Sequence, residues 1–424
     1  MTHQTLGLLI LPTVVTYSKM LARLAIGLDK QPHLIAHLVS KQAAGDESGS
    51  RETLPERAAN LLRQAFVTCL NDRSGQSTNG VNRDGQPEGK KRGIYTIANL
   101  CLKILFACRK TRGAAQIFEN IYNQSPPLNA FPKSERVTYL YYLGRFLWAN
   151  SHFYRAAMAL QNAFEECHSQ CLKQRRLILI YLVSANLACG RFPSSQLMSR
   201  PEAQGLSERF EPLCRAIKRG DIVQFRQVLN PGSREYAWFS FHRIDLQLKN
   251  RCELYVWRSL IRRCFVICGD HGNPDTRKAP TLDLNALVAL WRLQEIKYLE
   301  LIGQRQAYID PDFEGIEGLD TTSEEALGIP DMTSIISKVS SLMSQDLVNG
   351  YLALKMHKLA IQGARQKGAL PAGFPNIWNT IQAKSEGEVP GWKQEAKSSG
   401  GVSRSAFGPG SVINLSGARP VGMA

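Results

Sequence analysis

The feature that most constrains the fold is a helix–turn–helix pattern that recurs along the first half of the chain. Each copy has an apolar helix, a short polar turn and a second helix, and the turns fall near Arg112, His152, Arg191 and Gly220. Their spacing of about 30–40 residues is the period of helical solenoid repeats. Because one repeat cannot bury its apolar face alone, neighbouring repeats must stack on one continuous core. The pattern predicts a tetratricopeptide-like helical solenoid over residues 94–230.

The stretch 136–167 is the repeat that fits this pattern best. Leu143 and Gly144 on its first helix are followed by Ala156 and Leu160 on its second helix. Small residues at Gly144 and Ala156 allow two helices to approach closely. Its aromatic residues stand at helical spacing, which predicts the buried face of a repeat and not an exposed platform for base stacking.

The segments on either side predict further units. Residues 1–70 carry amphipathic patterns that predict N-terminal helical repeats. Residues 71–93 and 366–424 are rich in small and polar residues without apolar periodicity, so a disordered loop and a disordered tail are expected. The apolar opening segment lacks the basic region of a secretory signal and is too short to span a bilayer, so no membrane insertion is expected.

Residues 231–365 predict a winged helix. Three helical patterns lie within residues 251–268, 282–293 and 331–347. After the break at Asn349-Gly350, residues 351–352 and 359–361 can pair as a small β-hairpin. Residues 303–330 form an acidic insertion. The fold class expected is therefore dominated by α-helices, with a solenoid that continues into a winged helix.

The formal net charge of +16 suggests a nucleic acid, a membrane surface or an acidic protein as partner. Basic residues on the wing and the adjoining helices can neutralise phosphates with little sequence preference. The alternative is that these cations pair with acidic residues of a partner or of the insertion. The residues predicted to bind nucleic acid are Lys249, Arg251, Arg258, Arg262, Arg263, Lys338, Lys355 and Lys358. The third helix carries only Lys338, which argues against base reading in the major groove.

A second basic set lies in the solenoid. It consists of Lys173, Arg175, Arg176, Lys218 and Arg219. Cations near a helix end can complement the helix dipole, and they can equally dock a scaffold subunit.

No catalytic or metal-binding motif emerges from the sequence, so no enzymatic activity, no cofactor and no metal are expected. Two groups have ligand-type side chains: Cys167, His168 and Cys171, and Cys264, Cys268 and His271. In each group the cysteines are four residues apart on a predicted helix, which favours core-facing thiols over a zinc site. The ten cysteines show no disulfide framework, which indicates a reducing compartment.

A helical solenoid that continues into a winged helix resembles the PCI domain. Four segments carry a closer resemblance, RVTYLYYLGR (Arg136–Arg145), LKQRRLILIYLV (Leu172–Val183), FEPLCRAIKRGDIVQF (Phe210–Phe225) and VNGYLALKMHKLAI (Val348–Ile361). They resemble the PCI subunit of the TREX-two messenger-RNA export complex, in a branch that also includes COP9 signalosome subunit twelve. The resemblance covers residues from about 11 to 361, and the family has further helices upstream of the point where this chain begins.

This resemblance implies a non-enzymatic scaffold subunit of the nucleus. Its implied partners are a large helical scaffold subunit, a small acidic disordered subunit, RNA and double-stranded DNA. It would link transcription to export at the inner face of the nuclear pore, with some cytoplasmic pool. The alternative that the resemblance implies is a COP9-associated interaction module without nucleic-acid contact.

Overall fold

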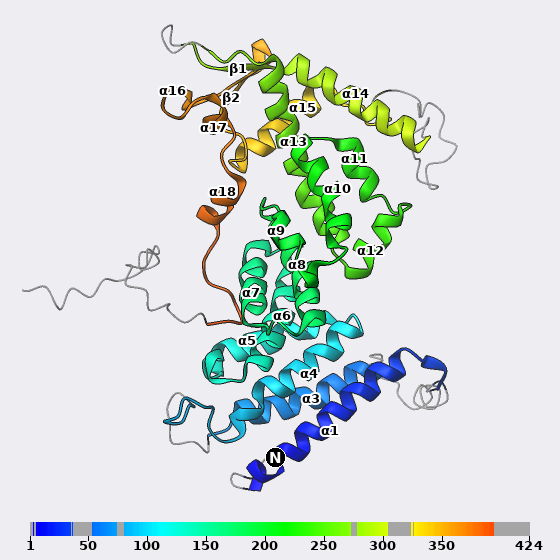
Figure 1. Ribbon diagram of the computed structural model, residues 1–424, viewed down its shortest axis with the longest axis vertical. Coiled ribbons are helices and arrows are strands. Elements are labelled where there is room, and N and C mark those ends of the chain that lie inside the picture. The colour runs from blue at the N-terminus through cyan, green and yellow to red at the C-terminus, as the bar shows by residue number, and fades with distance from the viewer. Residues whose placement is uncertain are drawn as a thin grey trace, which may run out of the picture.

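The structure is a computed structural model that describes residues 3, 6–34, 36, 53–73, 80–272, 278–303, 324 and 326–393. Helices stack along the length of the molecule, and a small antiparallel sheet lies at the end opposite the N-terminus (Figure 1). The predicted α-dominated fold class is thus confirmed. The expected insertion lies mostly outside the described residues, as does the tail beyond residue 393.

The solenoid is built of helices joined by short turns. Its elements are α1 (Leu6–Asp29), η1 (Pro32–Leu34), α3 (Leu54–Leu70), η2 (Gly89–Gly93), α4 (Ile94–Ala107), η3 (Thr111–Gly113), α5 (Ala114–Gln124), η4 (Leu128–Ala130), α6 (Lys133–Ala149), α7 (Phe153–Glu166), α8 (Leu172–Ala188), α9 (Ser195–Met198), η5 (Pro201–Ala203), α10 (Leu206–Arg219), α11 (Ile222–Val228) and α12 (Arg234–His242). Each of the four predicted turns separates two of these helices.

The contact between α6 and α7 explains why the best repeat needs a small residue. Gly144, Ala156 and Leu160 are all buried. A Cβ atom on Gly144 would lie 2.5 Å from Cγ of Leu160, well inside van der Waals contact. Tyr139 is also fully buried, with its ring edge-to-face against Tyr95. The stretch is therefore an internal packing face, as predicted.

Part of the segment predicted as a disordered loop is folded. Val81 and Pro87 form an isolated β-bridge, and η2 follows at once. Lys90 is anchored to Asp72: its Nζ lies 3.5 Å from Oδ1, and its backbone N–H donates to Oδ2. A buried ion pair therefore helps to hold residues 80–93 in place, although their sequence lacks apolar periodicity. Residues 74–79 lie outside the described part.

The first helix differs from what its composition predicts. Helix α1 has 24 residues, and by length and apolarity alone it could cross a membrane, so the expectation that this segment is too short is wrong. A core helix or a signal sequence meets the same criteria. Here Leu11, Ala22 and Ala25 pack inward on α3 and α4. The exposed apolar residues of α1 are Leu6, Leu8, Leu9, Ile10, Tyr17, Met20 and Leu24.

The winged helix has the predicted three helices and one strand more than predicted. Its elements are α13 (Asp245–Cys268), β1 (Thr281–Asp283), α14 (Leu284–Ile302), α15 (Met332–Ser344), β2 (Tyr351–Ala353), η7 (Leu354–Met356) and β3 (Lys358–Ala360). The strand order is β1-β3-β2, and Ala360 pairs with both Thr281 and Tyr351. The predicted hairpin is confirmed. The additional strand β1 is only three residues long, and it exists because β3 offers it a free edge.

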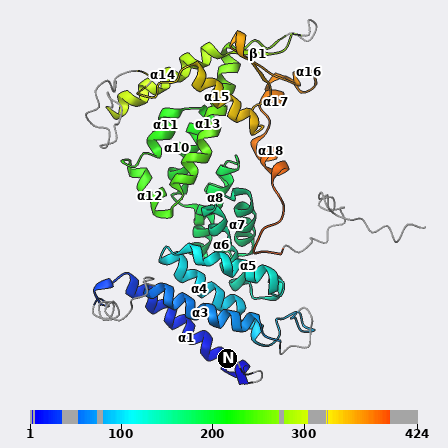
Figure 2. The same cartoon turned by 180° about the vertical axis from the view of Figure 1, so that it is seen from behind.

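After the winged helix the chain turns back along the solenoid. Three short helices follow, α16 (Ala364–Lys367), α17 (Ala369–Gly373) and α18 (Ile377–Lys384). The remaining described residues run down to α5 and α6, as both views show (Figures 1 and 2). We call residues 375–393 the C-terminal strap.

The strap is packed at several points, although the composition predicts disorder from residue 366 onward. Ile377 lies against Gly190, Val389 is completely buried, and the carbonyl of Gly391 accepts a hydrogen bond from Tyr139. These apolar contacts are too far apart in sequence to give a helical or strand period. The grooves that receive them belong to distant repeats, so the local sequence does not reveal them.

Candidate nucleic-acid interface

The eight predicted nucleic-acid residues do not form one exposed patch. The exposed ones are Lys249, Arg262, Arg263, Lys338 and Lys355, and the half-buried ones are Arg251, Arg258 and Lys358. The contacts that each side chain makes show whether it is a surface cation or a structural one.

Arg258 is a structural arginine. Its Nε donates a 2.9 Å hydrogen bond to the carbonyl of Leu347, and its Nη2 donates a 2.6 Å hydrogen bond to the carbonyl of Pro375. Burial, followed by the charge of Arg262, lowers the pKa of Arg258 to about 10. The guanidinium thus joins α13 to the segment after α15 and to the start of the strap. It does not belong to an exposed phosphate-binding surface, contrary to the sequence prediction.

Arg251 lies between the solenoid and the winged helix. Its guanidinium donates to the carbonyl of Ala188 at 3.4 Å and to Oε1 of Gln345 at 3.2 Å. It lines a cavity of 620 Å³ together with residues that include His152 and Arg155. Arg251 therefore joins α13 to the end of α8 and to the residue after α15.

The remaining cations on the helices have separate surroundings. Arg263 donates a 2.8 Å hydrogen bond to the carbonyl of Arg219, at the end of α10. The ammonium of Lys338 lies 5.6 Å from the centroid of the Trp257 ring. Within the described part of the acidic insertion, Glu324 pairs with Arg292 and not with Arg262 or Arg263. The outward face of α15 is otherwise made of small hydroxyl residues, Thr333, Ser334, Ser337, Ser340, Ser341 and Ser344.

Cations do converge around the β-hairpin. Lys355 is exposed in η7 at the tip of the hairpin, and Lys358 follows on β3. At the opposite end of the hairpin, a cavity of 570 Å³ is lined by residues that include Lys278, Tyr351 and Arg365. Because the strands have three residues each, the two ends of the hairpin are about 10 Å apart. We define the wing surface as Lys278, Tyr351, Lys355, Lys358, Arg365 and Lys367.

The wing surface has a surplus of positive charge. Two carboxylates lie beside these cations: Oδ2 of Asp270 is 2.5 Å from Nζ of Lys278, and Asp283 on β1 is the direct partner of Lys358 in the register of β1 and β3. The hydrogen bond from Lys278 and the backbone N–H of Gly272 lower the pKa of Asp270, and the charge of Lys358 acts in the same direction. The ring of Tyr351 is 50% exposed beside these cations. Basic groups beside an accessible ring suit a nucleic-acid backbone with limited base contact.

Sequence reasoning missed three members of the wing surface. Lys278 stands in the polar loop before β1, and Arg365 and Lys367 stand in α16. The only signal for Lys278 was its position just before an unrecognised strand. Lys367 was hidden because the composition from residue 366 onward predicts disorder, and Arg365 stands just before that boundary in a short helix that the sequence did not predict.

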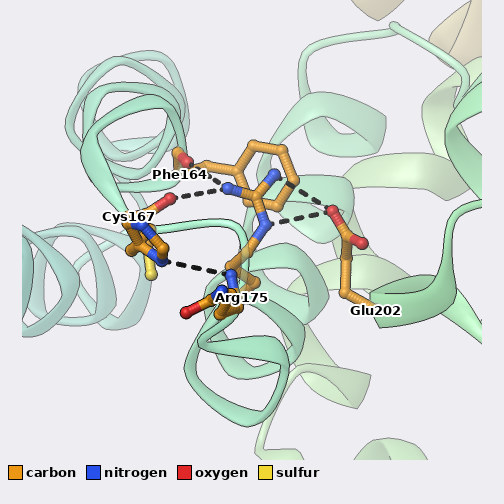
Figure 3. Close-up of polar contacts among 6 residues, drawn as sticks. Phe164, Cys167, Arg175 and Glu202 are labelled. Carbon is orange, nitrogen blue, oxygen red and sulfur yellow. Dashed lines mark hydrogen bonds and ion pairs between the residues drawn. The ribbon is translucent and has the colours of Figure 1, made fainter.

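The second basic set is partly internal. Arg175 donates from Nε and Nη2 to Oε1 of Glu202 at 3.1 and 3.0 Å, and from Nη1 to the carbonyl of Cys167 at 2.7 Å (Figure 3). Its guanidinium also lies 4.2 Å from the centroid of the Phe164 ring. Burial opposes the ionisation of Glu202, but hydrogen bonds from its own backbone and from Arg175 outweigh it and lower the pKa. Arg175 therefore ties α7, α8 and η5 together.

The cysteines and histidines do not assemble a site among the described residues. No group of three or more His, Cys, Asp or Glu side chains in this part of the chain is placed to hold a metal ion. Sγ of Cys264 and Sγ of Cys268 lie 3.9 Å apart on successive turns of α13, as two thiols on one helix face would. Cys189 lines the 620 Å³ cavity, but burial raises its pKa to about 12. A neutral thiol of this kind is a poor nucleophile at physiological pH.

Comparison with known proteins gives several relatives, although no protein-family model matches the chain. A PCI domain-containing protein of Schizosaccharomyces pombe is 31% identical over 278 residues, which cover 66% of this chain and 59% of that protein. A CSN12 homologue of Neurospora crassa is 30% identical over 61% of this chain and 59% of its own length. PCI domain-containing protein 2 of Danio rerio is 26% identical over 52% of this chain and 50% of its own length. The chain thus spans between half and three-fifths of these relatives.

Proposed function

We propose that the chain, which is similar to PCI domain-containing proteins and to CSN12 homologues, is a non-enzymatic scaffold subunit of a nuclear messenger-RNA export complex of the TREX-two kind. In this proposal the wing surface contacts RNA and double-stranded DNA. The solenoid pairs with a large helical subunit and with a small acidic disordered subunit, at the inner face of the nuclear pore.

The observation that carries the nucleic-acid contact is the wing surface. Five cations lie at the two ends and on one strand of a hairpin about 10 Å long, and they outnumber the neighbouring carboxylates of Asp270 and Asp283. Cations so arranged neutralise phosphates on either side of a groove and release counterions. The outward face of α15 adds hydroxyl groups that can bond to phosphate oxygens without reading bases.

A second function is supported by the names of several relatives. Proteins called CSN12 homologues from Neurospora crassa, Gibberella zeae and Schizosaccharomyces pombe match this chain. In this alternative the chain is a protein-interaction module tied to the COP9 signalosome, and the wing surface binds an acidic protein. The two functions predict different partners and different responses to salt.

Binding across a salt series tests the first function. The full chain, alone and in complex with its co-purified subunits, is titrated onto labelled duplex DNA and RNA at several salt concentrations. The expected logarithmic slope is about −0.9 for each neutralised phosphate on duplex DNA. The double variant Lys355→Ala/Arg365→Ala should reduce the slope by about 2 and weaken binding to all sequences alike.

A matched control separates the wing surface from general charge. The double variant Lys103→Ala/Lys173→Ala removes two exposed cations from α4 and α8, so it has the same net charge. Equal loss in both double variants, or binding that does not depend on salt, would contradict the wing surface as the nucleic-acid site. Identification of the subunits that co-purify with the tagged full chain then decides between an export complex and a COP9 complex.

A further inference from the structure

Helices α4, α6, α8 and α12 meet where Arg145 packs on the rings of Phe106 and Tyr181 and where the hydroxyl of Tyr181 donates to the carbonyl of His242, a place that includes no wing residue. Arg109 follows α4, Arg145 lies on α6, Arg176 lies on α8, and Arg243 follows α12. The end of α4 and helix α12 lie on the same edge of the stack in both views (Figures 1 and 2). We call these four residues the arginine cluster.

Arg145 forms the inner part of the cluster and is held by aromatic rings. Its guanidinium carbon lies 4.9 Å from the centroid of the Phe106 ring and 4.8 Å from that of Tyr181. Its Nη1 donates a weak 3.4 Å hydrogen bond to the hydroxyl of Tyr141. Rings attract a cation through their faces but carry no charge that cancels it.

The cluster brings like charges together without a counter-charge. In the part of the chain that the structure describes, no carboxylate lies within ion-pair distance of any of its four arginines. Burial first, and then the charges of Arg109 and Arg145, lower the pKa of Arg243. Burial first, and then Arg145 and Arg176, lower the pKa of His242. Such mutual repulsion costs free energy in the unliganded protein, and a bound polyanion would relieve it.

An exposed aromatic ring stands beside these cations. Phe241 is 82% exposed, the most exposed large apolar side chain among the described residues. The centroid of its ring lies 5.1 Å from that of His242, which in turn packs 4.7 Å from Trp238. Phe241 therefore contacts His242 while most of its ring stays open to solvent. Single-stranded nucleic acids are bound by this combination of cations for phosphates and open rings for bases.

We propose that the arginine cluster and Phe241 bind a single-stranded nucleic acid, with phosphates on the exposed guanidinium groups of Arg109 and Arg243 and one base stacked on the Phe241 ring. An acidic peptide would satisfy the charges but would leave the exposed ring with no distinct role, because the other rings already pack around Arg145. RNA is the source that follows from the proposed function, and this choice alone rests on that proposal.

The test measures binding of the full chain to oligouridylate of about 10 nucleotides, a length within the site sizes of single-strand binders. Phe241→Ala should weaken binding about 5- to 100-fold, the loss expected when one stacked base is released. Arg243→Ala should lower the logarithmic salt slope by about 0.7, the value for one phosphate of a single strand. Because both side chains are exposed, neither variant should change thermal unfolding.

Matched controls remove an exposed side chain of the same kind elsewhere. Leu301→Ala removes an exposed apolar side chain and Lys297→Ala removes an exposed cation, both on α14. Both should bind oligouridylate as the unchanged chain does. Oligothymidylate measured alongside separates RNA from DNA, and equal affinity for both assigns the site to single strands of either kind.

Two results would overturn the inference. One is oligouridylate binding that stays within about 2-fold of the unchanged chain in both Phe241→Ala and Arg243→Ala, since one released base alone should cost at least 5-fold. The other is that Arg243→Ala weakens the binding of polyglutamate but leaves the binding of oligouridylate unchanged. That result would assign the cluster to an acidic protein. In the wing variant Lys355→Ala/Arg365→Ala, oligouridylate should still stack on Phe241. Failure of the wing proposal and failure of the arginine-cluster proposal are therefore distinguishable.

Discussion

The hydroxyl of Tyr139 donates a hydrogen bond to the carbonyl oxygen of Gly391, which joins the first helix of the best-fitting repeat to the end of the C-terminal strap. Both residues are buried. Burial raises the pKa of Tyr139 well above its usual value, so the phenol stays a neutral donor over the physiological range. The contact therefore holds two segments that are 252 residues apart.

Tyr139→Phe should loosen the strap without altering the repeat core. The ring is retained, but the buried carbonyl of Gly391 loses its partner, at a cost of about 1–3 kcal/mol. Urea unfolding should show this loss, and limited proteolysis should cut the strap sooner. Tyr17→Phe removes a hydroxyl from an exposed ring and serves as control. Identical unfolding of the two variants would mean that the contact does not stabilise the protein.

Gly144→Ala should destabilise the solenoid. The added methyl group would press into Leu160, and such overpacking typically costs about 1–3 kcal/mol. Gly27 offers the matched control, since it lies within α1 and a Cβ atom there meets nothing within 4 Å. Gly27→Ala should leave stability unchanged or raise it by about 0.5–1 kcal/mol. A thermal melt of both variants checks the contrast, and equal midpoints would refute close packing of α6 on α7.

Arg258→Met should lower stability and spare nucleic-acid binding. The methionine keeps an apolar stem of similar length but leaves the carbonyls of Leu347 and Pro375 without their charged donor, which should cost about 1.5–3 kcal/mol. Its neighbour Arg262 is exposed, so Arg262→Met should change the free energy of unfolding by less than about 0.5 kcal/mol. Duplex-DNA binding measured well below the melting midpoint should be the same for Arg258→Met and the unchanged chain. Loss of duplex-DNA binding in Arg258→Met alone would show that Arg258 does belong to the nucleic-acid interface.

His242 should make the protein less stable as the pH falls. Its pKa in the folded state is lowered, by burial first and then by the charges of Arg145 and Arg176, while the unfolded state keeps a value near 6.5. The unfolded chain therefore takes up the proton first. This contribution is fully present above about pH 6.5 and is lost as the pH falls through the folded value.

His242→Gln tests this pH dependence. The variant removes the titrating group, so the slope of unfolding free energy against pH should be shallower below about pH 6.5. The comparison variant is His33→Gln, which alters an exposed imidazole on η1. A slope unchanged by His242→Gln would show that His242 titrates alike in the folded and unfolded chain. Saturating oligouridylate should also reduce the slope, because bound phosphates offset the repulsion from the arginines.

Sequence periodicity was sufficient to predict the repeats and the helices of the winged helix, because each buries one face at regular spacing. Gly144 and Ala156 were recognised for the same reason, since a helix contact demands small residues at fixed positions. The hairpin followed from the break at Asn349-Gly350. These features depend on neighbours in sequence or on a repeating neighbour in space.

The features that escaped prediction depend on partners far away in the chain. Strand β1 needs the edge of β3, and Lys90 needs Asp72. Arg258 has the composition of a surface cation, and only the carbonyls of Leu347 and Pro375 make it structural. The wing surface was predicted only in part, with Lys355 and Lys358 identified and Lys278, Arg365 and Lys367 missed, because its members come from three separate segments.

The C-terminal strap has a consequence for the order of events during synthesis. Folding on the ribosome proceeds from the N-terminus, so the repeats that receive Val389 and Gly391 emerge well before these residues exist. The surfaces of α5 and α6 that receive Gly391 are consequently uncovered in the nascent chain until the strap has been synthesised. During that interval they are open to chaperones or to an assembling partner, and closure of the strap ends this access.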